Sequence, residues 1–208
     1  MQLKSVLLVA NGDIFSTAFL ESLYNECNIS VAIDGGARHL FDIDKIPNFV
    51  IGDMDSEVHR GHNNNSIKEI ILATQSETDL VKTLKWCTTQ NFSSIELIGV
   101  EGGRSDHILG IYAAIVEANI DIQIRIHLKD FVVHILGEGN TDLFKVPKGK
   151  IISTFALMSC AGLSINGTKW ELDNVDLDFA TTGIHNESTG KQIEVEISNG
   201  KLALFIQR

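Results

Sequence analysis

Hydrophobic and polar residues alternate in two different ways along this chain. In about the first 125 residues, short apolar runs typical of buried strands alternate with stretches whose apolar residues recur at helical spacing. The runs predicted as strands are 5–10, 29–34, 48–52, 67–73 and 94–100, and the stretches predicted as helices are 16–26, 37–43, 78–89 and 106–119. Strands that alternate with helices are typical of a parallel sheet covered on both faces.

Two of these helices carry further signals. Ser16 or Thr17 is expected to cap the first helix, because a hydroxyl at that position accepts a hydrogen bond from a free backbone N–H group. The stretch 106–119 is apolar nearly all round, which predicts a buried helix.

The pattern changes after about residue 130. The β-like runs there are bounded by Gly, Asn and Ser, and they lie at 131–137, 142–146, 151–159, 162–165, 192–198 and 201–207. The segment SNGK (198–201) predicts a hairpin turn between the last two runs. We therefore expect an α/β domain with a parallel-type sheet flanked by helices at residues 1–128, followed by an all-β, sandwich-like domain at residues 129–208.

Composition and charge narrow the classes of partner. The 208 residues are 44% hydrophobic, as in globular domains, and the net charge is −10, from 27 acidic and 17 basic residues. Without a Lys/Arg-rich run, such a chain would repel a phosphate backbone, so we expect no nucleic-acid partner. The charge does not argue against a nucleotide that arrives as a metal complex.

Cysteine usage and apolar segments bear on location. Cys27, Cys87 and Cys160 are odd in number and far apart, which predicts free thiols in a reducing cytoplasm. The N-terminal apolar stretch is too short for a signal peptide, and no later run reaches membrane-spanning length. The expected location is the cytoplasm, with no membrane partner.

Polar groups follow several of the predicted strands of the first domain. The four stretches are DGGA (34–37), GDMDS (52–56), QSETDLVK (75–82) and GGRSDH (102–107). Ligands of open α/β sheets bind at the carboxyl ends of the strands, so these stretches form a candidate site. Each one alone is also explained as an ordinary turn.

The first candidate feature is the pair Asp53 and Asp55. In an extended chain these two carboxylates point the same way, and like charges held close together are unfavourable unless they share a cation or a proton. Carboxylate oxygens of this kind suit Mg²⁺, which completes its coordination with water and substrate phosphates. The alternative is a solvated turn before a helix that starts at Ser56.

Asp79 and Lys82 form the second feature. Asp79 at a predicted helix start is a third possible metal ligand, although the helix dipole alone also favours a carboxylate there. Lys82 lies one turn further on the same face, either as the ion-pair partner of Asp79 or as a cation aimed at phosphates.

Glycine-rich loops form the third feature. In GGRSDH, two glycines, the Arg104 guanidinium and a helix start at Asp106 are suitable anion ligands, although the loop matches neither a Walker A nor a GxGxxG fingerprint. Gly35 and Gly36 either admit a nucleotide or make a tight turn. Together the stretches predict a phosphate-bearing substrate held by a carboxylate-bound metal, a Lys and an Arg, as in phosphoryl or pyrophosphoryl transfer.

The order of these motifs, followed by GTKWEL (167–172) and HNE (185–187), resembles the thiamine pyrophosphokinase family over residues 34 to 190. The resemblance implies an α/β domain that binds Mg²⁺–ATP and a β-sandwich domain that binds thiamine. It also implies transfer of the pyrophosphoryl group of ATP to the thiamine hydroxyl, with AMP as the second product, in a homodimer whose active sites lie between subunits.

The resemblance also implies roles for residues. Those implied in catalysis are Asp53, Asp55, Asp79, Lys82 and Asp106, with the metal held by Asp53, Asp55 and Asp79. Those implied in nucleotide binding are Asp34, Gly35, Gly36, Gln75, Thr78, Gly103 and Arg104. Those implied in thiamine binding are Trp170, His185 and Asn186, where Trp170 lies against the thiamine rings and His185 stands in place of the family's serine.

Other interpretations remain open from the sequence. Trp170 would be sandwich core if it behaved as most lone tryptophans in β-domains do. The chain would instead be another Mg²⁺-dependent transferase or hydrolase that uses a nucleotide if the β-domain served a different acceptor. It would be a nucleotide sensor if it bound Mg²⁺–ATP without chemistry, and the second half would be a mere interaction module if residues 1–130 held full activity.

Overall fold

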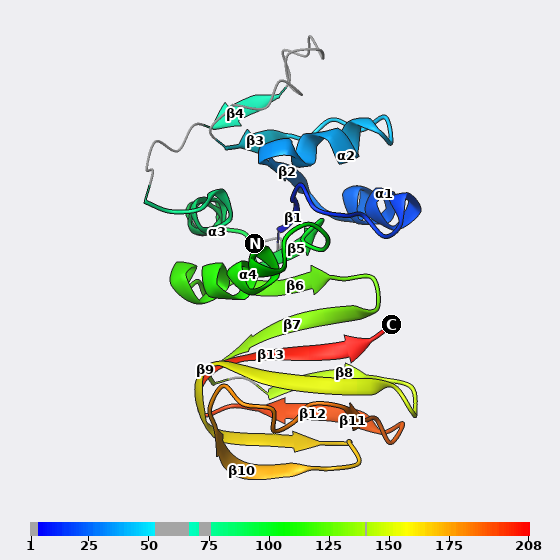
Figure 1. Cartoon of the computed structure of the whole chain (residues 1–208), viewed down its shortest axis with the longest axis vertical. Coiled ribbons are helices and arrows are strands. Elements are labelled where there is room, and N and C mark those ends of the chain that lie inside the picture. Colours follow the sequence, from blue (N-terminus) through cyan, green and yellow to red (C-terminus); the bar gives the residue numbers. More distant parts are fainter. Residues whose placement is uncertain (1–3, 53–66, 71–75, 140) are drawn as a thin grey trace. The chain divides into compact units, whose positions relative to one another are not determined.

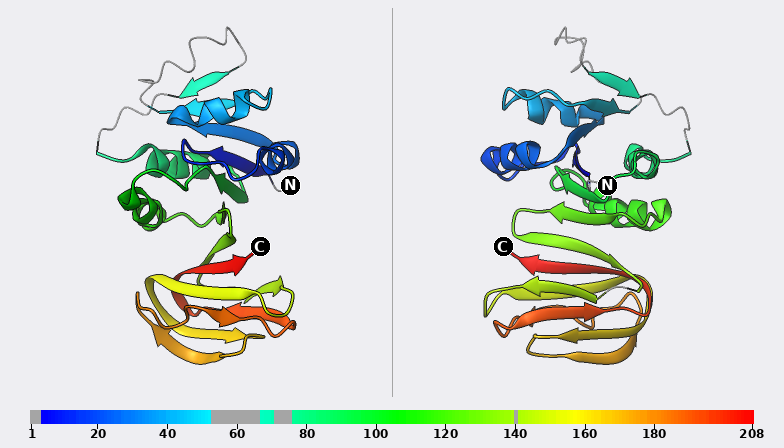
Figure 2. Two further views of the ribbon diagram at one scale, coloured as in Figure 1. Left: turned by 45° about the vertical axis from the view of Figure 1, so that its right-hand side comes forward. Right: turned by 180° about the vertical axis from the view of Figure 1, so that it is seen from behind.

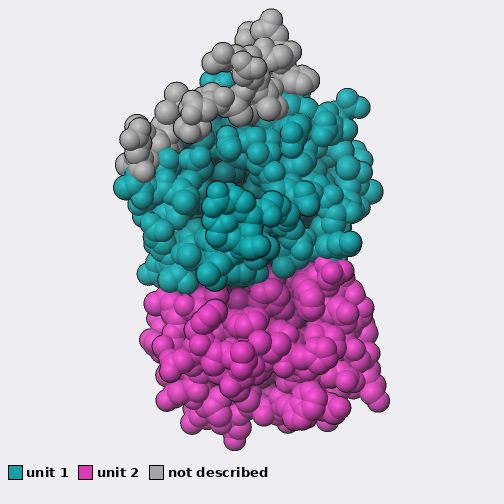
Figure 3. All heavy atoms as spheres, viewed as in Figure 1, with its two compact units in different colours: residues 1–122, 126–129 teal, residues 123–125, 130–208 magenta. Residues whose placement is uncertain are grey.

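The structure is a computed structural model that describes residues 4–52, 67–70, 76–139 and 141–208. The chain divides into two compact units, and Figure 3 colours them separately. The first unit comprises residues 1–122 and 126–129, and the second comprises residues 123–125 and 130–208.

The first unit contains a parallel sheet. Its strands are β1 (Ser5–Val9), β2 (Ile29–Ile33), β3 (Phe49–Ile51), β4 (Lys68–Ile70) and β5 (Ser94–Ile98). They lie in the order β4-β3-β2-β1-β5, and each adjacent pair is parallel. In the central strand β1, every residue from Val6 to Val9 is fully buried, which confirms a sheet covered on both faces.

Helices supply that cover. They are α1 (Thr17–Glu26), α2 (Ala37–Phe41), α3 (Asp79–Thr89) and α4 (Ser105–Ala118), with a short 3₁₀ turn at Asp34–Gly36. Figures 1 and 2 show α1 and α2 on one face of the sheet and α3 and α4 on the other. The predicted cap of α1 is Ser16, whose Oγ accepts a hydrogen bond from the Phe19 backbone N–H at 3.2 Å.

The helix α4 is less buried than its composition indicates. Only Ala114, Ile115 and Ala118 are buried, while Ile108 and Leu109 are 47% and 64% exposed. The prediction of a buried helix is therefore wrong for its first half. Apolar composition shows only that burial of a surface would be favourable, and none of the described residues of the first unit covers this part of the helix.

The second unit consists of antiparallel strands. They are β7 (Phe131–Gly137), β8 (Thr141–Lys145), β9 (Ile151–Asn166), β10 (Leu172–Leu177), β11 (Asn186–Glu187), β12 (Gln192–Glu196) and β13 (Asn199–Gln207). The paired order is β7-β13-β9-β12-β8, and β10 and β11 also pair with β9. The strand β6 (Gln123–His127) lies at the boundary between the units. The sequence pattern did not predict β6, β10 or β11. In β6 two isoleucines alternate with Gln, Arg and His, β10 is interrupted by Asp and Asn, and β11 has only two residues.

The long strand β9 connects two layers of the second unit. Residues 152–158 pair with β13, and residues 164–166 pair with β12. Two separate strands were predicted here, and they are one strand that passes Gly162 at a positive φ of 62°. A Cβ at Gly162 would lie 2.4 Å from the Ser198 Oγ, so glycine permits both the backbone angle and the close approach.

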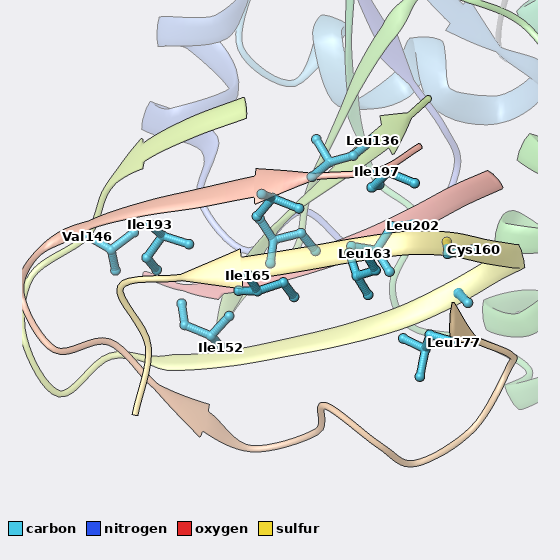
Figure 4. Close-up of a cluster of buried hydrophobic side chains, with 13 residues drawn as sticks. Leu136, Val146, Ile152, Cys160, Leu163, Ile165, Leu177, Ile193, Ile197 and Leu202 are labelled. Atoms are coloured by element: carbon cyan, nitrogen blue, oxygen red, sulfur yellow. The ribbon is translucent and has the colours of Figure 1, made fainter. Parts of the chain in front are cut away.

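The buried residues between the two layers form a single cluster, shown in Figure 4. Leu136, Ile152 and Leu202 come from strands of one layer, and Ile165 and Ile193 come from the other. Such a core between two antiparallel layers confirms the sandwich-like prediction.

The predicted hairpin at SNGK is wrong. The chain does turn there, but β12 and β13 are not paired with each other, because β9 lies between them in the strand order. A turn sequence predicts only a change of direction, whereas the pairing depends on which strand already lies alongside.

None of the helices among the described residues is both long enough and apolar enough to cross a membrane.

Candidate active site

The carboxyl edge of the parallel sheet is formed by loops that are bonded to one another. The loop after β1 and the loop after β5 are joined by the Gly12 N–H, which donates to the Gly99 carbonyl at 2.6 Å, and by the Asp13 N–H, which donates to the Glu101 carbonyl at 2.7 Å. These bonds hold the two loops in a fixed relation at the edge where α/β proteins bind ligands.

The DGGA segment packs directly on the loop after β1. A Cβ at Gly36 would lie 2.0 Å from the Val9 carbonyl oxygen, and one at Gly35 would lie 2.6 Å from the Asn11 side-chain nitrogen. Close backbone packing therefore explains both glycines without any ligand. Asp34 has a left-handed φ of 50°, an uncommon conformation for a residue other than glycine that is found often at functional sites.

The segment that carries Asp53 and Asp55 begins beside Asp34. A Cβ built on Gly52 would lie 3.2 Å from the Asp34 Cα. Asp53, Asp55 and Gln75 themselves lie outside the described residues.

The start of α3 carries Thr78, Asp79 and Lys82. The Thr78 hydroxyl accepts from the Val81 N–H at 3.4 Å and so acts as the helix cap. Lys82 Nζ lies 3.1 Å from Asp79 Oδ1, with side chains 11% and 25% exposed respectively. Among the described residues this is the only ion pair of Asp79, and the remaining lone pairs of the carboxylate are available to a metal.

The GGRSDH loop leads into α4. Gly102 and Gly103 both have positive φ, at 80° and 69°, and a Cβ at Gly102 would lie 2.4 Å from Asp13 Oδ2. A Cβ at Gly103 would meet no atom of the described residues within 4 Å, and Gly103 is exposed. The loop thus exposes its backbone where a ligand can approach closely.

Arg104 and Asp106 form a bidentate ion pair. Arg104 Nη2 donates to Asp106 Oδ2 at 2.8 Å, and Arg104 Nε donates to Oδ1 at 3.1 Å. The hydrogen bonds from Arg104 hold the pKa of the Asp106 carboxyl below its usual range, and the same bonds raise the pKa of Arg104. Both side chains are exposed, at 76% and 61%, and the pair leaves guanidinium N–H groups available to an anion.

The described residues do not bring all the predicted groups into contact. No ion pair among them joins Asp79 and Lys82 to Arg104 and Asp106, and no cluster of three potential metal ligands occurs within them. Of the four predicted stretches, DGGA and GGRSDH follow the parallel strands β2 and β5 at their carboxyl ends, and Asp79 and Lys82 lie in the first turn of α3.

The sequence analysis missed one polar loop at the same edge. The segment ANGD (10–13) follows β1, and the strand-end argument used for the other stretches would have found it. It also missed His39, whose Nε2 is buried with no partner in the described part of the chain. Burial lowers the pKa of His39, against a hydrogen bond to the Gly12 backbone that raises it. Nothing local in the sequence marks this histidine.

The second unit has its own pocket, of about 200 Å³. Its lining consists of Ile152, Thr154, Ile165, Trp170, Leu172, Thr182, Gly183, Ile184 and Asn186. Trp170 is 58% exposed, so it is not part of the sandwich core. Lys169 Nζ lies 4.7 Å from the centroid of its indole ring. An apolar pocket with an accessible indole suits a flat organic ring.

Asn186 lines this pocket, whereas His185 does not. His185 has a left-handed φ of 60°, its side chain is exposed, and its N–H donates to the Ser153 Oγ at 3.0 Å. Of the three residues implied in thiamine binding, Trp170 and Asn186 therefore line the same pocket, and His185 does not.

A larger and shallower depression of about 460 Å³ lies in the first unit between the carboxyl ends of α3 and α4. None of the predicted site residues lines it. We assign it no role.

An α/β unit with candidate anion-binding loops at its strand ends, followed by a β-sandwich with its own pocket, is the arrangement of a two-domain enzyme that uses a nucleotide and a second substrate. The sequence model "Thiamin pyrophosphokinase, catalytic domain" matches residues 20–128, and "Thiamin pyrophosphokinase, vitamin B1 binding domain" matches residues 138–202. The chain belongs to the thiamin pyrophosphokinase family.

Individual relatives agree with this assignment. A "Thiamin pyrophosphokinase 1" from Caenorhabditis elegans is 25% identical over 194 residues, which cover 86% of this chain and 79% of the relative. A "Thiamine pyrophosphokinase" from Bacillus subtilis is 26% identical over 186 residues, which cover 86% of this chain and 87% of the relative.

Solved structures share the fold. The B. subtilis thiamine pyrophosphokinase structure superposes with a TM-score of 0.78 at 23% identity and covers 98% of this chain and 99% of its own. The Candida albicans thiamin pyrophosphokinase superposes with a TM-score of 0.79 at 18% identity, over 99% of this chain and 89% of its own.

Proposed function

We propose that this chain transfers the pyrophosphoryl group of ATP to the hydroxyl of thiamine and so produces thiamine diphosphate and AMP. The observation that carries the proposal is the succession of two matches along one chain, a catalytic domain and a vitamin B1 binding domain. The accessible Trp170 in its pocket lies within the second of these.

We assign Mg²⁺–ATP binding to residues 1–128 and thiamine binding, with dimerisation, to residues 129–208. In the first domain the nucleotide lies on the strand-end loops, where Asp34, Gly35, Gly36, Gln75, Thr78, Gly103 and Arg104 contact it. The exposed backbone at Gly103 and the unpaired guanidinium N–H groups of Arg104 are the described features that favour phosphate binding there.

The residues fit a magnesium ion. Asp79 presents a carboxylate with free lone pairs at a helix start, and Asp53 and Asp55 supply two more hard oxygen ligands of the kind Mg²⁺ prefers. When bound, the ion supplies positive charge that offsets the charge of the polyphosphate.

The other side chains orient and neutralise. Lys82 is held by Asp79 at the edge of the site and offers its remaining N–H donors to the phosphates. The thiamine hydroxyl oxygen forms a bond to the β-phosphorus, the bond from that phosphorus to the αβ bridging oxygen breaks, and AMP leaves with that oxygen while the hydroxyl proton passes to solvent.

Asp106 acts in this scheme as an orienting group. Because Arg104 lowers the pKa of its carboxyl, Asp106 is a poor proton acceptor near neutral pH. It holds the Arg104 guanidinium in place through two hydrogen bonds.

Thiamine binds in the pocket of the second domain, where Trp170 stacks on its rings and Asn186 borders it, while His185, the third residue implied in thiamine binding, lies just outside the pocket lining. An indole face attracts a cationic ring such as a thiazolium. We further propose a homodimer with active sites between subunits. Large apolar side chains are exposed in both units, at Leu109 of α4 (64%) and Phe179 of the second unit (68%), as expected for surfaces that a second chain covers.

Cys27, Cys87 and Cys160 are not paired with one another in disulfides, which favours the reducing cytoplasm as the location of the reaction.

The test measures AMP release from Mg²⁺–ATP with thiamine, without thiamine, and with a thiamine analogue whose hydroxyl is replaced by hydrogen. We expect AMP only with thiamine, in a one-to-one ratio with thiamine diphosphate, and no AMP in an Asp55→Ala variant. AMP or ADP release that is indifferent to thiamine would indicate another nucleotide-using transferase or hydrolase. Tight Mg²⁺–ATP binding without any release would indicate a sensor, and activity of residues 1–130 alone would contradict the role of the second domain.

A further inference from the structure

The side-chain amide of Asn186 has no hydrogen-bonding capacity left for a ligand. Its Nδ2 donates to the Trp170 carbonyl at 2.7 Å and to the Thr168 Oγ1 at 3.1 Å. Its Oδ1 accepts from the Trp170 N–H at 3.1 Å and from the Glu187 N–H at 2.8 Å. A carboxamide has two donor hydrogens and two acceptor lone pairs, so all four are used within the chain.

The orientation of this amide is determined by its partners. Oδ1 faces two backbone N–H donors, and Nδ2 faces a carbonyl and a hydroxyl oxygen. Exchanging the two atoms would place two N–H groups against Nδ2 and an oxygen against a carbonyl, so only one orientation satisfies every group. With Asn186 only 8% exposed, breaking any of these bonds would leave a buried polar group unpaired.

Both backbone groups of Trp170 are held by this one side chain. Trp170 as a residue is 58% exposed and so receives little packing from its surroundings. Lys169 covers one face of the ring, and the ring lines the pocket. The position of the indole therefore depends on the Trp170 backbone. Asn186 holds that backbone through hydrogen bonds to both its N–H and its carbonyl, an arrangement called here the clamp.

We propose that Asn186 is a positioning residue that fixes the Trp170 platform for thiamine and does not itself bind thiamine. This inference rests on the proposed function for the identity of the ligand. A platform held in its binding position before the ligand arrives loses less conformational freedom on binding, which favours affinity.

The first experiment is a double-mutant cycle on the full-length protein, with Asn186→Ala, Trp170→Ala and the two combined. We expect Asn186→Ala to raise the KM for thiamine about 10-fold with a smaller change in kcat and in the KM for ATP. In the Trp170→Ala background, Asn186→Ala should add less than about 2-fold, because there is no platform left to position. Independent, multiplicative effects would overturn the proposal, because they are the result expected of a direct thiamine ligand.

A second variant separates positioning from contact and is gentler on the fold. Thr168 is 3% exposed and is not among the residues that line the pocket, but its hydroxyl accepts from Asn186 and donates to the Trp170 carbonyl at 3.1 Å. Thr168→Val should raise the KM for thiamine in the same direction as Asn186→Ala. An unchanged KM for thiamine in Thr168→Val would contradict the clamp.

The third measurement does not depend on activity. In a Trp86→Phe background, Trp170 is the remaining tryptophan, and its fluorescence anisotropy reports the freedom of the indole. We expect lower anisotropy in Asn186→Ala at unchanged far-ultraviolet circular dichroism, and unchanged anisotropy would overturn the proposal. If thiamine-dependent AMP release were absent from the wild type, the proposed function would fail while this measurement still decided the clamp.

Discussion

Lys82 Nζ lies 3.1 Å from Asp79 Oδ1 at the start of α3, and a second ion pair, Lys85 to Glu77 at 2.6 Å, lies beside it. Both pairs are partly exposed and involve a lysine of α3, but only the first belongs to the predicted site. Neighbouring ion pairs on one helix therefore allow a pair with a proposed catalytic role to be compared with a pair outside the proposed site.

We predict that Asp79→Asn lowers thiamine-dependent AMP release by about 100-fold or more, because a metal ligand and the partner of Lys82 are lost together. Stability should change by less than about 1 kcal/mol, since partly exposed ion pairs contribute little. Steady-state kinetics and urea unfolding measure the two effects. Glu77→Gln is the control, and a comparable loss of activity in that variant would show that the ion pairs matter only for the structure of α3.

His39 predicts a contribution to the pH dependence of stability. Burial lowers the pKa of His39 in the folded state, so the unfolded state binds more protons as the pH falls below about 6.5. The free energy of unfolding should therefore decrease as the pH is lowered through that range, and this decrease should be less steep in His39→Gln. Urea unfolding between about pH 5 and 8 tests this. Parallel curves for the two proteins would contradict it.

The pair Glu96 and His127 predicts a large structural effect away from the site. Glu96 Oε2 and His127 Nε2 lie 2.7 Å apart, and their side chains are only 4% and 7% exposed. Glu96→Ala leaves that buried ring nitrogen without its carboxylate partner and opens a cavity, so we expect a loss of about 2 to 4 kcal/mol. Glu96→Gln, which keeps the shape, should cost less.

The control for this prediction is the surface pair of Glu21 and Lys45, at 3.0 Å with side chains 49% and 27% exposed. Glu21→Ala should cost less than about 1 kcal/mol. Equal costs at the two sites, measured by urea unfolding, would mean that burial does not strengthen the Glu96 pair.

The exposed half of α4 predicts an assembly. We expect the wild type to have about twice the chain's mass of 22.9 kDa in light scattering, and Leu109→Asp to shift it toward the monomer. Because Leu109 is 64% exposed, the circular dichroism spectrum of the Leu109→Asp variant should match that of the wild type. A wild-type monomer at micromolar concentration would contradict the proposed homodimer.

Local patterns were sufficient for most elements of the first unit. The cap at Ser16 and the strand–helix alternation depend on contacts within a few residues, which a sequence expresses directly. The strand-end rule also placed Asp34, Arg104 and their neighbours on one sheet edge, because parallel connections return every strand in the same direction. The same rule, applied to the segment after β1, would have added Asn11 and Asp13.

Pairing in the second unit was beyond such patterns. SNGK indicated a turn, but whether β12 and β13 pair depends on β9, which runs through both layers and separates them. The apolar composition of 106–119 was misleading for a related reason, because no described residue of the first unit covers Ile108 and Leu109.

The sequence by itself determined the class of fold, the family and the residues available for chemistry, since these follow from residue types and their order. Only the tertiary structure decided what those residues do to one another. It showed Trp170 exposed instead of buried in the core, Asp106 paired with Arg104, and the Asn186 amide fully hydrogen-bonded to Thr168, Trp170 and Glu187. The physical reason is that hydrogen-bond partners and burial depend on segments far apart in the chain, and a linear pattern carries no record of which segments meet.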